Sequence, residues 1–226
     1  MKKDKINSLK KGIVFFGAPG SGKGTQSALL SDRFRIPLVS MGQLLRTEVS
    51  QKTKLGEKIE CFLKKGEYLN TLDVIEVLKT QLNKILDTWV ILDGVPRSIE
   101  QAEAIEQCAS VTFLNIEAVI FLKIPPEKIW ERIQNRLSCV QCQKDYCYKV
   151  ALCKNCGSIK FAKRSDDTEE TVFRRLHVFN EKIRNVLDFY QNQKKLYVLQ
   201  ADRPVEEVYL DVLSCVKILV QEKSLF

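Results

Sequence analysis

Short apolar runs recur along the chain and alternate with longer segments of mixed polarity. The runs lie at Ile13–Phe16, Pro37–Ser40, Trp89–Leu92, Val119–Ile124 and Leu196–Leu199. Between them, apolar residues repeat with helical period, most clearly over Thr71–Leu86, Pro125–Leu137 and Thr168–Gln193. Strands that are apolar on both sides and alternate with helices predict an α/β fold, with a five-stranded parallel sheet covered by helices on both faces.

Two segments interrupt this alternation. Residues 42–86 form a helical excursion, and residues 138–165 contain closely spaced cysteines. We expect both to be mobile flaps over a site at the carboxyl ends of the strands. The predicted organisation is a flexible basic tail over 1–12, a core over 13–137 and 166–226 that includes the excursion 42–86, and a lid over 138–165.

The first apolar run leads into the glycine-rich segment GAPGSGKGT, residues 17–25, and then into a helical pattern at Gln26–Phe34. Glycines let the backbone N–H groups point inward, the helix dipole favours negative charge, and Lys23 adds a full positive charge. The segment therefore predicts a nucleoside triphosphate site, against the alternative of a turn without a ligand. Lys23 is followed by Gly24 before the hydroxyl of Thr25, which favours small-molecule phosphoryl transfer over a motor or switch GTPase.

Four of the eight cysteines have metal-site spacing: Cys139-x-x-Cys142 and, ten residues later, Cys153-x-x-Cys156. Such paired knuckles favour a closed tetrahedral zinc site; an iron–sulfur or redox centre and a metal-free hairpin are the alternatives. Cys147 lies between the knuckles and could compete as a ligand. The remaining cysteines, in helical patterns, are expected to be buried thiols: Cys61, Cys108 and Cys215.

The 226 residues are 45% hydrophobic and 28% charged, with a net charge of +8. The basic residues concentrate in the first 12 positions and in 123–164, a distribution that suits a site for several phosphates better than a nucleic-acid groove. No apolar run approaches the roughly 18 residues of a membrane span, and the N-terminal segment has no signal-peptide pattern. We therefore expect a cytoplasmic protein without a membrane or nucleic-acid partner.

The third apolar run ends in Asp93, Gly94 and, three residues on, Arg97. A carboxylate at a strand end beside a phosphate loop can hold Mg²⁺ directly or through water, and an arginine can bind an anion through two parallel hydrogen bonds. Any single arginine is as well explained by a solvated surface position. Six of them suggest a transfer site: Arg46, Arg97, Arg132, Arg136, Arg164 and Arg175.

These segments together resemble the adenylate kinase family of nucleoside-monophosphate kinases. The resemblance rests on GAPGSGKGTQ, VSMGQLLR, GVPRSIEQA and RSDDTEETVFRRL, while CVQC and CKNC match the zinc-bearing lid of the long bacterial type. It implies reversible conversion of ATP and AMP to two ADP by in-line transfer, in a monomer that uses Mg²⁺ with ATP and a structural Zn²⁺ in the lid. It implies no histidine base, and His177 is expected to be structural.

The resemblance also implies roles for matching positions. The candidate catalytic residues are Lys23, Asp93, Arg97, Arg136, Arg164 and Arg175. Those for ATP are Gly20, Ser21, Gly22, Lys23, Gly24, Thr25, Arg132 and Arg136, with Arg132 near the base. Those for AMP are Met41, Arg46, Leu69, Gly94, Arg97, Gln101, Arg164 and Arg175, with Gln101 reading adenine. The candidate metal ligands are Cys139, Cys142, Cys153 and Cys156.

Several positions depart from the family pattern. Met41 and Gln43 stand where the family usually has a hydroxyl residue and an aspartate, Leu137 stands where a further arginine is frequent, and Cys147 stands where histidine is common. Met41 keeps open a kinase for another nucleoside monophosphate. A P-loop ATPase with a nucleic-acid-binding zinc ribbon is a further alternative, but it would leave the arginines and Asp166-Asp167 unexplained.

Overall fold

The computed structural model describes residues 9–65, 67–107, 114–146 and 150–223. Its core strands are β1 (Lys10–Gly17), β2 (Leu38–Ser40), β3 (Trp89–Asp93), β4 (Leu114–Lys123) and β8 (Leu196–Gln200). Its helices are α1 (Lys23–Phe34), α2 (Met41–Ser50), α3 (Lys54–Lys65), α4 (Thr71–Leu82), α5 (Ile99–Gln107), α7 (Pro126–Gln134), α8 (Glu169–Asn192) and α9 (Val205–Lys223). Three short strands belong to the lid: β5 (Leu137–Cys139), β6 (Asp145–Tyr146) and β7 (Phe161–Ala162).

The five core strands form one parallel sheet in the order β2-β3-β1-β4-β8, which confirms the predicted fold class. Strand β1 lies in the middle, where Val14 pairs with Leu92 of β3 and Val119 of β4. All three of these side chains are fully buried. Because central strands have helices on both faces, they need apolar residues at nearly every position.

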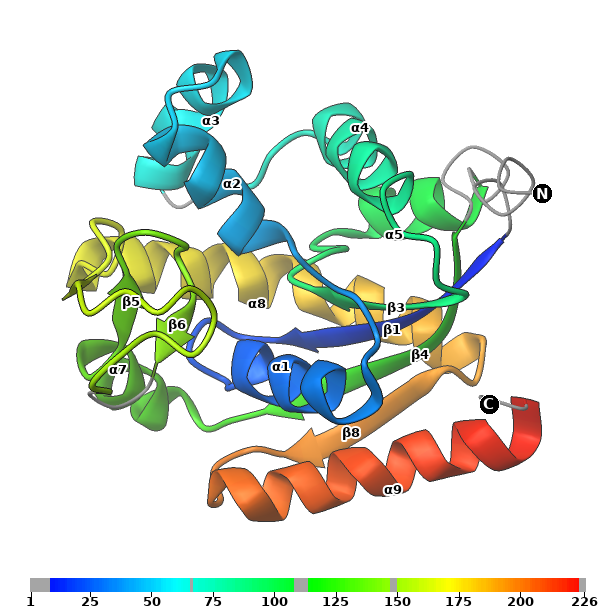
Figure 1. Cartoon of the computed structure of the whole chain (residues 1–226). Helices are drawn as coiled ribbons and strands as arrows, with labels where there is room; N and C mark the ends of the chain where they lie inside the picture. Colours follow the sequence, from blue (N-terminus) through cyan, green and yellow to red (C-terminus); the bar gives the residue numbers. More distant parts are fainter. Residues whose placement is uncertain (1–8, 66, 108–113, 147–149, 224–226) are drawn as a thin grey trace.

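Alternate residues of β1 pack into two separate hydrophobic cores. Ile13 and Phe15 belong to the core shared with α1 and α9, whereas Val14 and Phe16 belong to the core shared with α4, α5 and α8. Figure 1 shows α1 and α9 on one side of the sheet and α4, α5 and α8 on the other. Burial of each such side chain contributes about 1.5–3 kcal/mol, so both layers hold the strand rigidly beneath the loop that follows it.

Two boundaries differ from the sequence predictions. The tail was expected to extend to residue 12, but β1 begins at Lys10, whose side chain is 1% exposed. Lys10 pairs with Leu114 and Lys11 with Trp89, so the ladders to β3 and β4 fix this backbone despite its polar side chains. The helix expected over Pro125–Leu137 ends at Gln134, because Leu137 pairs with Tyr146 and starts the lid sheet.

The two interruptions of the pattern lie at the carboxyl ends of the core strands, where Figure 1 shows α2 and α3 above the sheet and the lid beside them. The first interruption forms α2, α3 and α4, and α4 is capped by the Asn70 side chain, which accepts a hydrogen bond from Asp73 N–H at 2.9 Å. The lid is a small antiparallel sheet in the order β6-β5-β7. No helix in the described part of the chain has the length and apolar character of a membrane span.

Candidate functional site

The glycine-rich loop joins β1 to the N-terminus of α1. Gly20 and Gly22 have φ values of 78° and 93°, which only glycine adopts without strain. Gly22 also caps α1, so the first N–H groups of the helix face the loop. The Ser21 hydroxyl is buried and has no hydrogen-bond partner among the described residues. A phosphate oxygen would satisfy both the hydroxyl and the helix end.

Lys23 is the first residue of α1, and its ammonium donates a hydrogen bond to the Ala18 carbonyl at 3.1 Å. Burial lowers its pKa to about 8, and the positive charges of Arg97, Arg136 and Arg164 act in the same direction, against the opposing effect of Asp93. An anion bound at the loop would relieve this repulsion, so the site is electrostatically prepared for negative charge.

Asp93 ends β3 and faces the same loop. Its Oδ2 accepts a hydrogen bond from the Ser40 hydroxyl at 2.9 Å, and its buried Oδ1 has no partner among the residues that the structure describes. A Cβ on Gly24 would come within 3.5 Å of Asp93 Oδ2, so the carboxylate lies against the start of α1. A hard cation or its water shell suits such an unpaired carboxylate oxygen, and this donor fits Mg²⁺.

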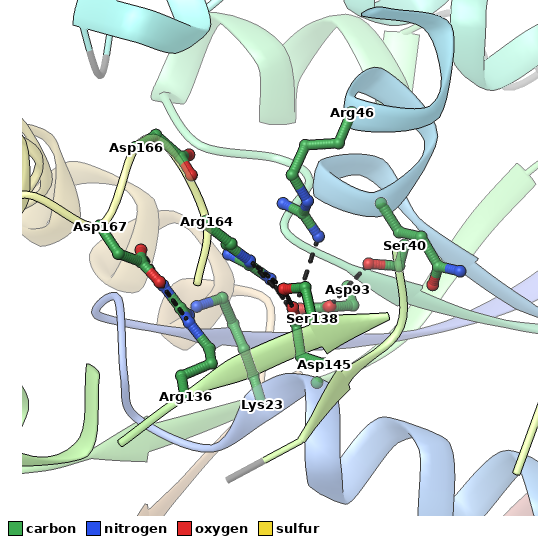
Figure 2. A network of polar contacts seen from close by, with 12 residues as sticks. Lys23, Ser40, Arg46, Asp93, Arg136, Ser138, Asp145, Arg164, Asp166 and Asp167 are labelled. Carbon is green, nitrogen blue, oxygen red and sulfur yellow. Dashed lines mark hydrogen bonds and ion pairs between the residues drawn. The ribbon is translucent and has the colours of Figure 1, made fainter. Parts of the chain in front are cut away.

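Four arginines gather with acidic residues at the mouth of the site, as Figure 2 shows for three of them. Arg136 donates two hydrogen bonds to Asp167, one of them from Nε at 2.9 Å, and Arg175 pairs with Asp166. Arg164 pairs with Asp145 of the lid, and Arg46 of α2 approaches the same carboxylate at 3.6 Å. The structure thus brings together arginines from α2, α8 and both ends of the lid.

Burial and like charge dominate the electrostatics of this cluster. Desolvation lowers the pKa of Arg46 to about 10, helped by Arg136 and Arg175. Desolvation also lowers the pKa of Arg164, with Arg46 and Arg136 as the next causes among the positive charges. Burial alone would raise the pKa of Asp166, but Arg175 and Arg164 hold it below its usual range. The excess positive charge indicates a site for polyanions.

A second pocket lies between α2, α4 and the end of β3. It is lined by five residues that the sequence assigned to AMP and by apolar neighbours: Met41, Leu69, Gly94, Arg97, Gln101, Leu45, Leu63, Val74 and Val95. Glu67 completes the lining. Apolar walls with a few polar groups are typical of sites that bind small molecules.

Arg97 and Gln101 are both fixed to the backbone of this pocket. Arg97 Nε donates to the Gly94 carbonyl at 2.7 Å, and the guanidinium lies 5.3 Å from the centre of the Tyr68 ring. Gln101 accepts a hydrogen bond from Arg97 N–H at 2.8 Å and donates one to the Leu69 carbonyl at 3.3 Å. These two bonds use one N–H and one lone pair of the Gln101 amide, so a second N–H and a second lone pair remain for a bound base.

The remaining arginine of the set, Arg132 on α7, lies beside the phosphate loop. Its Nη2 donates to the Ala201 carbonyl at 2.7 Å, and a Cβ on Gly22 would come within 3.9 Å of its Nη1. The hydrogen bond to the segment after β8 orients its guanidinium along the edge of the loop.

The four knuckle cysteines converge in the lid. Their sulfur atoms all lie within 4.8 Å of one another, and Cys139 and Cys153 are buried. The Tyr146 hydroxyl donates to Cys153 Sγ at 3.2 Å and accepts from Lys154 N–H at 2.9 Å. Four thiolates around a common centre can hold a metal ion with closed tetrahedral geometry.

The burial of the other described cysteines agrees only in part with the prediction. Cys215 is buried as expected, but Cys61 is exposed, because α3 turns Gly56 and Ile59 inward and leaves position 61 outside that stripe. Cys108 and Cys147 lie outside the described residues. His177 is exposed on α8 and lies 3.5 Å from Glu181, away from the arginine cluster.

Three residues at the site were not singled out by the sequence. Tyr68 precedes the predicted pocket residue Leu69, and Ser40 ends an apolar run beside Met41, so adjacency to a motif could have indicated both. Asp145 lies among the lysines of the lid, and its only sequence signal is its opposite charge. Its position against two arginines depends on the packing of the lid over α2.

A glycine-rich loop at the carboxyl edge of a parallel sheet, facing arginines and a second pocket, defines a P-loop nucleotide kinase. The family profile described as adenylate kinase matches residues 15–195. The chain belongs to the adenylate kinase family.

Curated relatives with that name cover nearly the whole chain. The adenylate kinase of Caldicellulosiruptor bescii is 35% identical over 213 residues, which are 91% of this chain and 99% of that protein. Those of Clostridium perfringens (strain SM101) and Clostridium tetani are 34% and 32% identical, over 93% and 88% of this chain and 99% and 95% of their own lengths.

Proposed function

We propose that the chain catalyses the reversible transfer of the terminal phosphoryl group of ATP to AMP, which yields two ADP. The observation that carries the proposal is the position of two anion-binding regions around one arginine cluster: the phosphate loop with Lys23, and the pocket with Arg97 and Gln101. The membership of the adenylate kinase family and the names of the relatives support the same reaction.

For ATP, we propose that the loop from Gly20 to Thr25 holds the phosphates, with Lys23 on the transferring group. Arg132 would lie against the base, since its guanidinium is fixed at the edge of the loop. Mg²⁺ would supply charge neutralisation on the ATP phosphates when bound, and Asp93 would hold it directly or through water, supported by its unpaired Oδ1.

For AMP, we propose that Met41, Leu69 and Gly94 surround the base, that Gln101 reads adenine, and that Arg46 and Arg97 hold the phosphate. Arg136, Arg164 and Arg175 would then neutralise the charge that spreads over the transferring group. Asp166 and Asp167 support this role, because they orient Arg175 and Arg136 by ion pairs. Transfer by this means depends on in-line positioning and charge neutralisation and needs no strong base.

In the lid, we propose a structural Zn²⁺ on Cys139, Cys142, Cys153 and Cys156. Four thiolates fill a tetrahedral site and leave no position for water or substrate, so the ion would organise structure only. We also propose that the protein acts as a monomer, as its resemblance to the adenylate kinase family implies.

One observation favours a second candidate, a kinase with a broader choice of monophosphate. Met41 is 2% exposed and lines the base pocket, so it supplies apolar contact where the family usually offers a hydroxyl. A pocket that discriminates bases by shape and by Gln101 alone has fewer hydrogen bonds with which to reject other bases.

The test is ³¹P NMR of the purified protein with Mg²⁺ and nucleotides. ATP and AMP together should yield ADP without inorganic phosphate, and omission of AMP should leave ATP intact. Lys23→Ala should lower the turnover at least roughly a hundredfold, because this charge stabilises the transition state. Release of inorganic phosphate from ATP alone would indicate an ATPase and would contradict the proposal.

A further inference from the structure

Tyr68 lies in the connection between α3 and α4, and the backbone is fixed on both sides of it. The preceding residue, Glu67, donates its N–H to the Phe62 carbonyl at 3.0 Å. The following residue, Leu69, is buried, and its carbonyl accepts a hydrogen bond from the Gln101 amide at 3.3 Å. These neighbouring contacts restrict where the half-buried ring of Tyr68 can lie.

The ring of Tyr68 meets two cations. The guanidinium carbon of Arg97 lies 5.3 Å from the ring centre, and the ammonium of Lys182 on α8 lies 5.8 Å from it. Both distances fall within the roughly 6 Å over which an aromatic face attracts a cation. Burial raises the pKa of the Tyr68 phenol, against the opposing effect of Arg97 and Arg175, so the ring is uncharged near neutral pH. The attraction therefore comes from the ring and not from a phenolate.

The backbone of Tyr68 is also tied to that of Arg97. Gln101 joins the two segments, because it accepts a hydrogen bond from Arg97 N–H at 2.8 Å and donates one to the carbonyl of Leu69, next to Tyr68. The two residues are therefore linked twice, once through the Gln101 amide and once through the contact between ring and guanidinium. This double link sets the place of the guanidinium at the end of β3.

The ring orients Arg97 without adding negative charge. Arg175 shows the other arrangement, since its guanidinium pairs with the carboxylate of Asp166. Within the described part of the chain, the direct side-chain partners of Arg97 are the Gly94 carbonyl, bonded through Nε, and the Tyr68 ring. A carboxylate in the place of the ring would repel a phosphate and compete for the Nη donors, whereas a neutral ring does neither.

We propose that Tyr68 is a positioning residue for the acceptor phosphate: its ring holds the Arg97 guanidinium in the orientation in which the Nη groups bind the monophosphate. This inference rests on the proposed function, because it takes Arg97 as a residue that holds that phosphate. The pocket for the base is lined by Glu67 and Leu69 but not by Tyr68 between them. Tyr68 therefore acts on the monophosphate through Arg97 and not through the base.

The experiment measures kcat and the KM values for AMP and ATP in a coupled assay with the full chain. Tyr68→Leu removes the ring but keeps an apolar side chain. It should raise KM for AMP roughly three- to tenfold and leave kcat and KM for ATP within about twofold of the wild type. Tyr68→Phe keeps the ring and should restore KM for AMP to within about twofold of the wild type. A rise in Tyr68→Phe equal to that in Tyr68→Leu would overturn the proposal, because the hydroxyl would then be responsible.

Lys182→Gln is the matched control, because it removes the exposed cation that contacts the same ring. Its KM for AMP should match the wild type. A rise equal to that in Tyr68→Leu would show that the ring does not act through Arg97 in particular and would overturn the proposal.

Arg97→Ala separates this proposal from the proposed function. If Arg97→Ala leaves KM for AMP unchanged, the assigned role of Arg97 fails and the positioning role fails with it. If Arg97→Ala raises KM for AMP but Tyr68→Leu does not, the positioning role alone is wrong. In the double variant, Tyr68→Leu should add little to the effect of Arg97→Ala, since residues that act through one contact are not additive. A full additional rise would show that the ring acts independently of Arg97.

Melting temperatures establish that the variants fold. If Tyr68→Leu does not fold, Tyr68→Met repeats the test with a flexible apolar side chain. Loss of folding in both variants would overturn the proposal, because Tyr68 would then be needed for the fold rather than for the orientation of Arg97.

Discussion

Lys23 illustrates how single residues at this site are tuned by their surroundings. Its ammonium lies at the start of α1, where burial and nearby arginines lower its pKa to about 8. The charged form therefore predominates near neutral pH but by a smaller margin than for an exposed lysine. The same environment that prepares the loop for phosphate also makes its key charge sensitive to pH.

This gives a pH prediction for the free protein. Because the folded-state pKa of Lys23 is lowered, the cation is present below about pH 8 and is lost as the pH rises above it. We expect kcat/KM for ATP to fall with rising pH through this range, since kcat/KM reports groups of the free enzyme. Lys23→Arg stays charged, so the decline of kcat/KM with pH should disappear in this variant. In Lys23→Ala, kcat/KM should be low and should not change with pH in this range. A decline that begins only near pH 10 would contradict the assignment.

Met41 gives a prediction about selectivity. Met41→Thr restores a hydroxyl in the base pocket, and one hydrogen bond is worth roughly 0.5–1.5 kcal/mol, a few-fold to about tenfold in discrimination. The preference for AMP over the other monophosphates should therefore increase in the variant. Measurement of kcat/KM for each acceptor checks this, with melting temperature as the control for folding. Unchanged selectivity would mean that position 41 does not contact the base.

At the scale of elements, polar contacts join α2 to the lid within the described part of the chain. The Gln43 hydrogen bond to Cys142 is one of them, and it uses the residue that stands where the family usually has aspartate. An amide can donate to a carbonyl, whereas a carboxylate cannot. Gln43 therefore allows a direct hydrogen bond between α2 and the lid. The carboxylate of an aspartate at this position would instead repel the carbonyl oxygen of Cys142.

We expect Gln43→Ala to loosen the lid without altering the phosphate loop. Loss of one such hydrogen bond should speed hydrogen exchange of the lid amides a few-fold to about tenfold in the substrate-free protein. Gln191→Ala is the matched control, because Gln191 lies exposed on α8. Equal exchange in the two variants would show that the contact does not hold the flaps together.

The lid sheet also depends on its cysteine cluster. Its three strands contain only two or three residues each, too few to be stable alone, so metal binding should provide most of its folding free energy. Elemental analysis should find about one zinc per chain in the wild type and in Cys147→Ser, and a large loss in Cys156→Ser. Chelation should lower the melting temperature of the lid while the loop still binds ATP. Loss of the metal in Cys147→Ser would show that Cys147 is a ligand and would contradict the proposed set of four cysteines.

Across the whole molecule, the sequence predicted what local chemistry determines. The five core strands follow from runs that are apolar on both sides, and the phosphate loop and cysteine knuckles follow from spacing along the chain. Asp145 was missed because its contact with Arg46 joins positions that are distant in the sequence. The start of β1 at Lys10 was missed for a related reason: neighbouring strands extend it through polar residues that carry no apolar pattern.

The central claim is that ATP and AMP meet between the two flaps, and acceptor specificity tests it most directly. A coupled assay would measure kcat/KM for ADP formation from Mg·ATP with AMP, CMP, UMP and GMP in turn. The account predicts that AMP gives the highest value and that Gln101→Ala reduces the preference for AMP while the other acceptors change less. A higher value with CMP, UMP or GMP, or no transfer to any of the four, would contradict it.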